Sequence, residues 1–346
     1  MTSEAPRVDE AAMAAMLAPA LGAPVALEKL SGGYSNITML AKGARGEAIV
    51  RMPPPGAAHI KSGHDVIREA RILEKLHPVF AMAPQPLVII DDASVAGVPF
   101  FAMERVRGRV LRSKAPAGVD LSEPVMRALS TAFVDALAQL HAVDVVAAGI
   151  TGKPEGYVQR QVDGWRERYE KSKTDEVSDM ERLSLWLNDH VPSTVGRVTM
   201  VHNDFKYDNL VVDESDASRI VGVLDWELST VGDPMTDLGT SLAYWIEGSD
   251  GDDVRMLPLG LTYLPGNLTR AELVARYEDK IGRSVDDLLF HVILASFKVA
   301  VIAQQIYYRF AKGFTQDPRF ATLGFAVAVI AAKATRMLDA GRIDVG

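Results

Sequence analysis

The chain has 346 residues, of which 48% are hydrophobic, so it is long enough for two lobes and apolar enough to bury a substantial core. Its formal net charge of −8 argues against a nucleic-acid-binding protein, which would carry a basic balance or a basic stripe. The absence of cysteine excludes disulfides, thiol catalysis and thiolate metal sites, and it is compatible with the reducing cytoplasm in which we expect the protein.

The ends of the chain predict helices rather than membrane segments. Residues 1–21 carry acidic side chains where a secretion signal would carry positive charge, so they predict a short helix. The most apolar stretch, residues 320–332, is shorter than the roughly 20 residues of a membrane span. We therefore expect a soluble protein with no membrane partner.

The N-terminal third predicts a β-rich region. Residues 25–52 read as a three-stranded meander, and residues 86–103 read as two further strands joined by a turn. Between them, residues 65–77 predict an amphipathic helix that ends at Pro78. Glu69 falls on the apolar side of this helix, where a carboxylate is costly unless it has a partner.

A change of character follows residue 103. Residues 104–108 are polar and predict a hinge between an N-terminal lobe, residues 1–103, and a C-terminal lobe, residues 109–346. The second lobe opens with a strong amphipathic helix at residues 122–141 and is mainly helical. Together these elements predict an α+β fold with a small β-rich lobe and a larger helical lobe.

Polar residues recur at fixed places between the predicted strands of residues 198–226. A first strand leads into a His-Asn-Asp tripeptide that ends at Asp204, the next strand begins at Asn209, and the returning strand ends at Asp225. The return places Asp225 near Asn209, and an amide oxygen beside a carboxylate suits Mg²⁺. Asp204 precedes them in a loop, within reach of a substrate hydroxyl that it would serve as base.

These residues carry a resemblance to a known family. The segments V-H-N-D-F-K-Y-D-N-L-V-V-D, G-V-L-D-W-E and G-D-P-M-T-D-L-G resemble the catalytic core of the aminoglycoside and choline kinase branch of the protein-kinase-like fold. The segments R-M-P-P-P-G, H-D-V-x-R-E, F-x-M-E-R-V-R-G and F-K-x-A are similar to the kinase-like domains that are fused to some acyl-CoA dehydrogenases. The resemblance, from about residue 27 to residue 308, implies a two-lobed protein-kinase-like fold.

The resemblance implies roles for the residues of the motif. Asp204 is the catalytic base that orients the acceptor hydroxyl, and Lys206 neutralises the phosphoryl group in transfer. Asn209 and Asp225 hold Mg²⁺ on the phosphates of ATP or GTP. Two further residues are expected to support the loop: His202 and Asp237.

The resemblance also places nucleotide binding in the N-terminal lobe. A Gly-Gly turn, which lacks the full G-x-G-x-x-G of protein kinases, would cover the phosphates, and the connector after Met103 would contact adenine through its backbone. Arg51 stands where this fold normally has a lysine, and we expect a bidentate pair with Glu69, with a plain structural salt bridge as the alternative. The predicted nucleotide-binding residues are Gly32, Gly33, Ser35, Asn36, Arg51, Glu69, Glu104 and Val106.

The acceptor stays open between a cation and an anion. The acidic run at residues 247–253 would suit an aminoglycoside- or choline-type cation, although its glycines and serine favour a solvated loop. Two other sets of side chains would suit a carboxylate or phosphate if they faced the site. They are Lys298, Gln305 and Arg309 on one helix face, and Arg107, Arg109 and Arg112 after the hinge. The likeness to domains fused to acyl-CoA dehydrogenases implies a hydroxy acid or a hydroxyacyl thioester.

The motif favours one activity over two others. A Mg²⁺-dependent kinase acting on a small-molecule hydroxyl is favoured because the full set of catalytic residues is present. A nucleotide-binding pseudokinase without turnover is supported only by Arg51. A protein kinase is disfavoured because D-F-G and A-P-E segments are absent and residues 228–234 leave little room for an activation loop.

Overall fold

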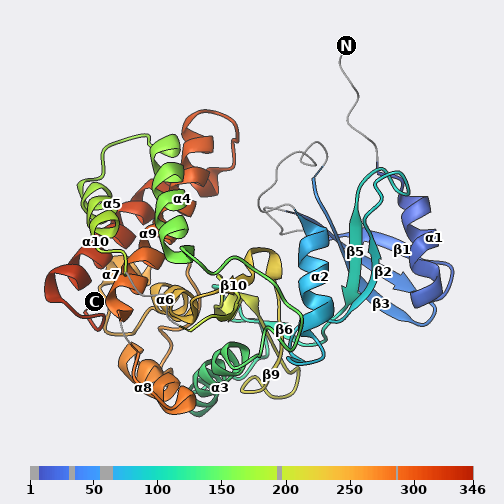
Figure 1. Ribbon diagram of the computed structural model, residues 1–346, viewed down its shortest axis with the longest axis horizontal. Helices are drawn as coiled ribbons and strands as arrows, with labels where there is room; N and C mark the ends of the chain where they lie inside the picture. The colour runs from blue at the N-terminus through green and yellow to red at the C-terminus, as the bar shows by residue number, and fades with distance from the viewer. Residues whose placement is uncertain (1–7, 31–35, 55–64, 193–196, 286, 346) are drawn as a thin grey trace. The chain divides into compact units, whose positions relative to one another are not determined.

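The structure is a computed structural model that describes residues 8–30, 36–54, 65–192, 197–285 and 287–345. The chain forms two compact units (Figure 1). Unit 1 comprises Met1–Gly108, Val146–Ile150 and Val221–Ser229, and unit 2 comprises Arg109–Val145, Thr151–Ile220 and Thr230–Gly346. Unit 1 therefore takes in two short segments from far along the sequence, and one of them carries Asp225.

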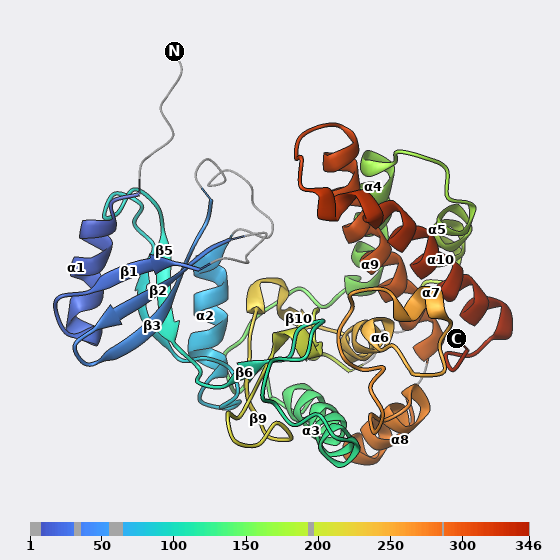
Figure 2. The same cartoon turned by 180° about the vertical axis from the view of Figure 1, so that it is seen from behind.

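Unit 1 is built on a five-stranded antiparallel sheet in the order β1-β2-β3-β5-β4. The strands are β1 (Ala26–Lys29), β2 (Ile37–Gly43), β3 (Gly46–Met52), β4 (Pro86–Ile90) and β5 (Phe100–Glu104). Helices α1 (Glu10–Leu21) and α2 (Val66–Leu76) lie on opposite faces of this sheet (Figures 1 and 2). The predicted meander, strand pair and helix are all present.

The alternation of side chains along β3 decides what each face of the sheet receives. Val50 is fully buried in an apolar cluster with Met13 and Leu17 of α1. Because successive strand residues point to opposite faces, the next residue, Arg51, points to the face covered by α2. Glu69 lies on the buried side of α2 and is 1% exposed, so the inward carboxylate has a cation as its partner.

Unit 2 is mainly helical, as predicted. Its α-helices are α3 (Glu123–His141), α4 (Tyr157–Ser172), α5 (Ser178–Asp189), α6 (Pro234–Tyr244), α7 (Asp252–Arg255), α8 (Arg270–Ile281), α9 (Leu288–Ala311) and α10 (Leu323–Ala340). The 3-10 helix η4 (Pro318–Thr322) precedes α10. The mixed architecture, with a small antiparallel sheet and a mainly helical remainder, is the predicted fold class.

Short strands carry the motif region. Strand β6 (Arg109–Val110) pairs with β8 (Leu210–Val212), and β7 (Thr199–Val201) pairs with β10 (Thr230–Gly232). The predicted strand at residues 209–213 begins one residue later, because Asn209 ends the 3-10 helix η2 (Tyr207–Asn209). A polar turn then leads to β9 (Ile220–Val223) and is closed by the Asp213 N–H, which donates to the Arg219 carbonyl at 2.9 Å.

Helix α9 runs through the middle of unit 2 and contacts α4, α5, α6 and α10 (Figure 2). The contact with α6 is close at Gly239, where a Cβ atom would lie 2.6 Å from the backbone of His291, so only glycine fits there. By length and hydropathy alone, α9 and the segment Pro318–Ala340 could cross a membrane, but 72% of the apolar window of α9 is buried inside the protein. Packing within unit 2 therefore accounts for the apolar character of α9.

Candidate active site

The predicted catalytic loop follows β7 directly and is anchored from behind. Asp237, a fully buried residue of α6, accepts hydrogen bonds from the N–H groups of His202, at 2.5 Å, and Asn203. His141 Nε2 lies 3.3 Å from the Asp237 carboxylate, and His141 Nδ1 lies 2.6 Å from the Tyr277 hydroxyl. The loop backbone is thus tied to three helices of unit 2, and Asp237 occupies the bracing position that the sequence predicted.

Asp204 meets two of its predicted partners within unit 2. Lys206 Nζ lies 3.0 Å from Asp204 Oδ2, and Asn209 Nδ2 donates to the same oxygen at 3.0 Å and to the Asp204 carbonyl at 2.8 Å. Burial raises the pKa of Asp204, but the charges of Lys206 and Lys298 outweigh burial and leave the pKa below its usual value. Asp204 is therefore an anion at neutral pH, suited to accept a hydrogen bond from a hydroxyl and to orient it.

The ammonium group of Lys206 is held by an aromatic ring as well as by Asp204. Its Nζ lies 4.3 Å from the ring centroid of Tyr244, the last residue of α6. Burial lowers the pKa of Lys206, but Tyr244 and Asp204 together raise it by more than burial lowers it. The pKa therefore lies above its usual value, and the side chain is charged. Sequence reasoning missed Tyr244, because nothing in the pattern relates the end of α6 to Lys206.

In unit 1, Arg51 is shared among three carboxylates. Its Nη1 lies 2.8 Å from Glu69 Oε1 and 3.1 Å from Asp225 Oδ1, and its Nη2 lies 2.8 Å from Glu227 Oε2. The expected bidentate pair with Glu69 is therefore wrong: Glu69 uses one oxygen only, because the second terminal nitrogen of Arg51 serves Glu227. Glu227 was not predicted as a site residue, although it follows Asp225 by two positions in L-D-W-E.

Burial shifts the pKa values of this cluster. Burial lowers the pKa of Arg51, but Glu69, Asp225 and Glu227 together raise it by more than burial lowers it, so the guanidinium stays charged. Burial, helped by the nearby carboxylates and opposed by Arg51, raises the pKa of Glu69 to about 7. Among the described residues, Arg51 alone lies within ion-pair distance of these three carboxylates, and the charge of Arg68 acts on Glu69 as well. Three acidic groups thus face two nearby cations, so the cluster is suited to receive another cation.

Asp225 is positioned by a segment that is fastened to α2. The Arg68 guanidinium donates to the Ser229 carbonyl at 2.7 Å and also to the Glu227 carbonyl. Asp225 itself has a left-handed backbone with φ of 67°, which is uncommon for a residue other than glycine. Its side chain is 40% exposed, so the carboxylate remains accessible beside Arg51.

The donor atoms fit the predicted metal. Asn209 uses Nδ2 toward Asp204, which leaves its amide oxygen as a ligand atom, and Asp225 uses Oδ1 toward Arg51, which leaves Oδ2. Two oxygen ligands completed by phosphate oxygens and water suit Mg²⁺. Asn209 belongs to unit 2 and Asp225 to unit 1, and their joint ligation of Mg²⁺ stays a prediction.

The predicted nucleotide-binding residues are placed in part. Gly32, Gly33 and Ser35 lie outside the described residues, and the Asn36 side chain donates to Glu227 Oε2 at 3.0 Å. On the connector, the Glu104 N–H donates to the Gln85 carbonyl at 2.9 Å as part of the sheet. Within the part of the chain that the structure describes, the Val106 N–H has no backbone partner, so it is the group suited to bind adenine.

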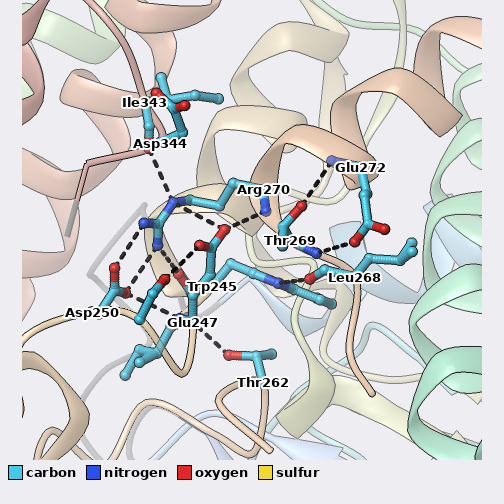
Figure 3. Close-up of polar contacts among 12 residues, drawn as sticks. Trp245, Glu247, Asp250, Thr262, Leu268, Thr269, Arg270, Glu272, Ile343 and Asp344 are labelled. Atoms are coloured by element: carbon cyan, nitrogen blue, oxygen red, sulfur yellow. Dashed lines mark hydrogen bonds and ion pairs between the residues drawn. The ribbon is translucent and has the colours of Figure 1, made fainter. Parts of the chain in front are cut away.

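The acidic run at residues 247–253 is exposed over much of its length, as expected of a solvated loop, but Asp250 is buried in an ion cluster. Asp250 binds the Arg270 guanidinium through both oxygens, at 2.7 and 2.9 Å (Figure 3), and Lys333 Nζ lies 3.0 Å away. Glu247 accepts from the backbone N–H of Arg270, and the exposed Asp252 pairs with Arg255. Asp250, the buried carboxylate of the run, is therefore already paired with internal cations.

The two sets of cations considered for an anionic acceptor make different contacts in the structure. Arg107 lies 3.3 Å from Glu47 and is 73% exposed, and Arg109 donates to the Ala117 carbonyl at 3.0 Å, so neither contacts a catalytic-loop residue through these bonds. Lys298 is different, because its Nζ reaches the carbonyl of Asn203 in the catalytic loop. The helix spacing predicted which residues share its face but not what that face contacts.

Comparison with known proteins agrees with this geometry. The model of the phosphotransferase enzyme family matches residues 26–273. Acyl-CoA dehydrogenase family member 11 of Rattus norvegicus is 33% identical over 293 residues, covering 81% of this chain and 36% of that protein. Acyl-CoA dehydrogenase family member 10 of Mus musculus is 32% identical over 299 residues, covering 84% of this chain and 27% of that protein. The chain thus spans about a third or less of these relatives.

Solved structures show the same fold. A Ralstonia eutropha protein provisionally assigned as an aminoglycoside phosphotransferase has a TM-score of 0.78 and 29% identity, covering 94% of this chain and 96% of that one. Choline kinase from Cryptosporidium parvum has a TM-score of 0.62 and 11% identity, covering 96% and 97%. A thermostable mutant of the aminoglycoside phosphotransferase APH(4)-Ia, in a ternary complex with AMP-PNP and hygromycin B, has a TM-score of 0.56 and 17% identity, covering 93% and 98%.

Proposed function

Because this chain belongs to the phosphotransferase enzyme family, with a fold like that of aminoglycoside and choline kinases, we propose that it moves the γ-phosphoryl group of ATP or GTP to a hydroxyl group of a small anionic molecule. The observation that carries the proposal is the arrangement around Asp204. Lys206 and Asn209 both lie 3.0 Å from its carboxylate, in a loop braced by Asp237. A fold requires no such grouping of buried charge.

The roles follow from the charges. Asp204 accepts a hydrogen bond from the acceptor hydroxyl, whose oxygen forms a new bond to the γ-phosphorus while the bond from that phosphorus to the β,γ-bridging oxygen breaks. The hydroxyl proton passes to Asp204, and the nucleoside diphosphate leaves. Since the pKa of Asp204 is low, proton transfer comes late and the main work of Asp204 is orientation. Lys206 stabilises the charge on the phosphoryl oxygens.

The donor is proposed to bind as a Mg²⁺ complex. Asn209 and Asp225 would hold the metal through oxygen atoms, and bound Mg²⁺ would neutralise the charge on the phosphates. Arg51, already among carboxylates, would contact the α- and β-phosphates. The excess of acidic groups around Arg51 supports this assignment, because a divalent cation would restore the charge balance.

The acceptor is proposed to be a hydroxy acid or a hydroxyacyl thioester. Lys206 is a cation 3.0 Å from Asp204, which favours an anion near the reacting hydroxyl. Asp250, the buried carboxylate of the acidic run that would have suited a cation, is already paired with Arg270 and Lys333. The curated relatives are named as acyl-CoA dehydrogenase family members, and an acyl thioester is the substrate class that such a name indicates.

A nucleotide-consumption screen tests this proposal. The panel consists of hydroxy acids, their coenzyme A thioesters, aminoglycosides and choline, with Mg-ATP or Mg-GTP as donor and Asp204→Ala as the blank. We expect turnover with hydroxylated anions that is absent in the blank. Turnover with aminoglycosides or choline alone would replace the anionic acceptor by a cationic one. Tight Mg-nucleotide binding by calorimetry, without turnover on any acceptor, would instead identify a nucleotide-binding pseudokinase.

A further inference from the structure

Asn203, the residue before Asp204, is held in an uncommon backbone conformation. Its φ is 65°, in the left-handed region that residues other than glycine rarely adopt. Its N–H donates to Asp237, and its side-chain oxygen accepts a hydrogen bond from the Tyr157 hydroxyl at 2.7 Å. Such a conformation persists only where surrounding contacts hold it, so each contact on Asn203 affects the direction in which the chain enters Asp204.

Lys298 supplies the contact that bears most directly on Asp204. Its Nζ donates to the carbonyl oxygen of Asn203, and this carbonyl belongs to the same planar peptide group as the Asp204 N–H. At the opposite edge of the same peptide group, the Asp204 N–H donates to His202 Nδ1 at 3.2 Å. The peptide plane leading into the base is therefore held at both of its polar ends.

The burial of Lys298 is costly for a residue that only fills space. Lys298 lies on α9 and is 6% exposed, and among the described residues no carboxylate lies within 4.0 Å of its Nζ. Burial lowers the pKa of Lys298, while Asp204 and Asp237 oppose that effect and Lys206 adds to it. A charged ammonium in this place therefore lowers the free energy of unfolding relative to an apolar side chain of the same length.

The neighbouring helix offers a matched comparison. Lys333 on α10 is 7% exposed, nearly as buried as Lys298, but its Nζ lies 3.0 Å from the Asp250 carboxylate. Asp250 in turn binds Arg270, so Lys333 belongs to an ion cluster that involves none of the catalytic-loop residues. Two buried lysines in the same unit thus have different partners. Lys333 binds the Asp250 carboxylate and lies 3.5 Å from the Trp245 carbonyl, whereas Lys298 binds the backbone of the catalytic loop, with its Nζ 5.9 Å from the ring centroid of Trp165.

We propose that Lys298 is a positioning residue, which holds the Asn203–Asp204 peptide group so that the Asp204 carboxylate points at the acceptor hydroxyl. The inference rests on the proposed kinase activity for its kinetic consequence, but its structural part is independent of the acceptor. Lys298 acts through Asn203 and makes no proton transfer itself.

The test compares Lys298→Met with Lys333→Met in the full chain. For Lys298→Met we expect kcat to fall roughly 10- to 100-fold, because a small misplacement of a catalytic group has an effect of this size. The KM values for nucleotide and acceptor should stay within about twofold, since Lys298 contacts neither. The Tm should equal or exceed that of the wild type, because an unpaired buried charge has been removed. Lys298→Arg, which can still donate to the carbonyl, should recover part of kcat.

Lys333→Met should leave kcat at the wild-type value, in contrast to Lys298→Met, and should leave KM unchanged as well. A kcat for Lys298→Met within twofold of the wild type would overturn the proposal. So would a fall in kcat matched by a fall in Tm in both lysine variants, because that pattern indicates a general packing role. If Lys298→Met does not fold, Lys298→Leu takes its place, because leucine likewise cannot donate to the Asn203 carbonyl: wild-type kcat together with an unmoved Asn203 amide resonance in Lys298→Leu would overturn the proposal.

A structural measurement separates this inference from the proposed function. In ¹⁵N-labelled protein, Lys298→Met should shift the Asn203 and Asp204 amide resonances and speed the hydrogen exchange of both amides, and Lys333→Met should leave them in place. If the wild type has no turnover with any acceptor, the proposed function fails while these resonances still test Lys298. Unchanged Asn203 and Asp204 resonances in Lys298→Met would overturn the positioning role whatever the activity.

Discussion

The buried charges of the two units are arranged around opposite signs. In unit 1, the cation Arg51 meets three carboxylates, those of Glu69, Asp225 and Glu227. In unit 2, the carboxylate of Asp204 is acted on by two lysines, Lys206 and Lys298, on which Asp208 and Asp237 act in turn. The proposed phosphoryl transfer assigns the metal cation to the carboxylates of unit 1 and the transferred phosphoryl group to Lys206 of unit 2.

A third cluster shows what a balanced arrangement looks like. Arg270 lies between Asp250 and Glu247 (Figure 3), and Lys333 pairs with Asp250, so two cations meet two carboxylates. The cluster joins the start of α8 to α10 and the loop after α6, and the Arg270 Nε donates to the Ile343 carbonyl at 3.0 Å. The Asp250 cluster, with equal numbers of cations and carboxylates, therefore joins structural elements of unit 2. The Arg51 cluster, with more carboxylates than cations, belongs to the proposed reaction site.

The largest expected effect breaks the unit 2 side of the comparison. Asp204→Ala should lower kcat by about 10³-fold or more, since a positioned base contributes roughly 10²- to 10⁴-fold and Asp204 also holds Lys206 and Asn209 in place. Nucleotide affinity by calorimetry should change less than about threefold. The matched control is Asp250→Asn, which breaks the balanced cluster: it should lower Tm and leave kcat per folded molecule unchanged. Near-wild-type turnover in Asp204→Ala would refute the assignment of the base.

Removing Arg51, the cation that the three carboxylates of unit 1 share, should destabilise the chain. Arg51→Met leaves buried carboxylates without their partner, and we expect a loss of about 3 kcal/mol in the free energy of unfolding, measured by urea denaturation. Adding Glu69→Gln should recover part of that loss, because it removes one of the unpaired charges. The control is Arg71→Met, which breaks an exposed pair with Glu74 on the same helix and should cost less than about 1 kcal/mol. Equal losses in the two variants would show that the Arg51 cluster is not special.

Asp225→Ala should sharpen the assignment of unit 1 to the metal. We expect at least a roughly tenfold weaker affinity for Mg-nucleotide, since even residues that only orient metal ligands contribute 10- to 100-fold in affinity. In the presence of EDTA, the variant and the wild type should bind free nucleotide with similar affinity. A difference that persists without Mg²⁺ would mean that Asp225 acts through Arg51 rather than as a metal ligand.

A further effect depends on pH. The pKa of Glu69 is about 7 in the folded chain against 4.5 as the ordinary value, so between these pH values the folded state binds a proton that the unfolded state has lost. Stability from this group is therefore full below about pH 4.5 and is lost as pH rises toward 7, with a slope of at most about 1.4 kcal/mol per pH unit. Glu69→Gln should lack this slope in urea titrations from pH 4.5 to 7. A constant difference between variant and wild type would contradict the pKa.

Local patterns predicted the elements well and the long-range contacts less well. The β-rich and helical regions, α2 with Asp65 at its start, and the loop after β7 all follow from periodicity, capping and turn residues that act over a few positions. Glu227, Tyr244 and the contact made by Lys298 were not predicted, because each pairs with a residue at least 38 positions away. Within the acidic run, the burial of Asp250 was missed for the same reason: its partners, Arg270 and Lys333, are 20 and 83 positions from Asp250.

The sequence by itself determined the α+β fold class, the family resemblance and the candidate residues Asp204, Lys206, Asn209 and Asp225, because all of these depend on residue types at short, fixed spacing. Only the tertiary structure decided how buried charges are shared. It divided Arg51 among three carboxylates, paired Asp250 with two cations, and placed Lys298 on the backbone of the catalytic loop. The physical reason is that a buried charge must find its partner wherever packing brings one, and packing joins residues that no local pattern connects.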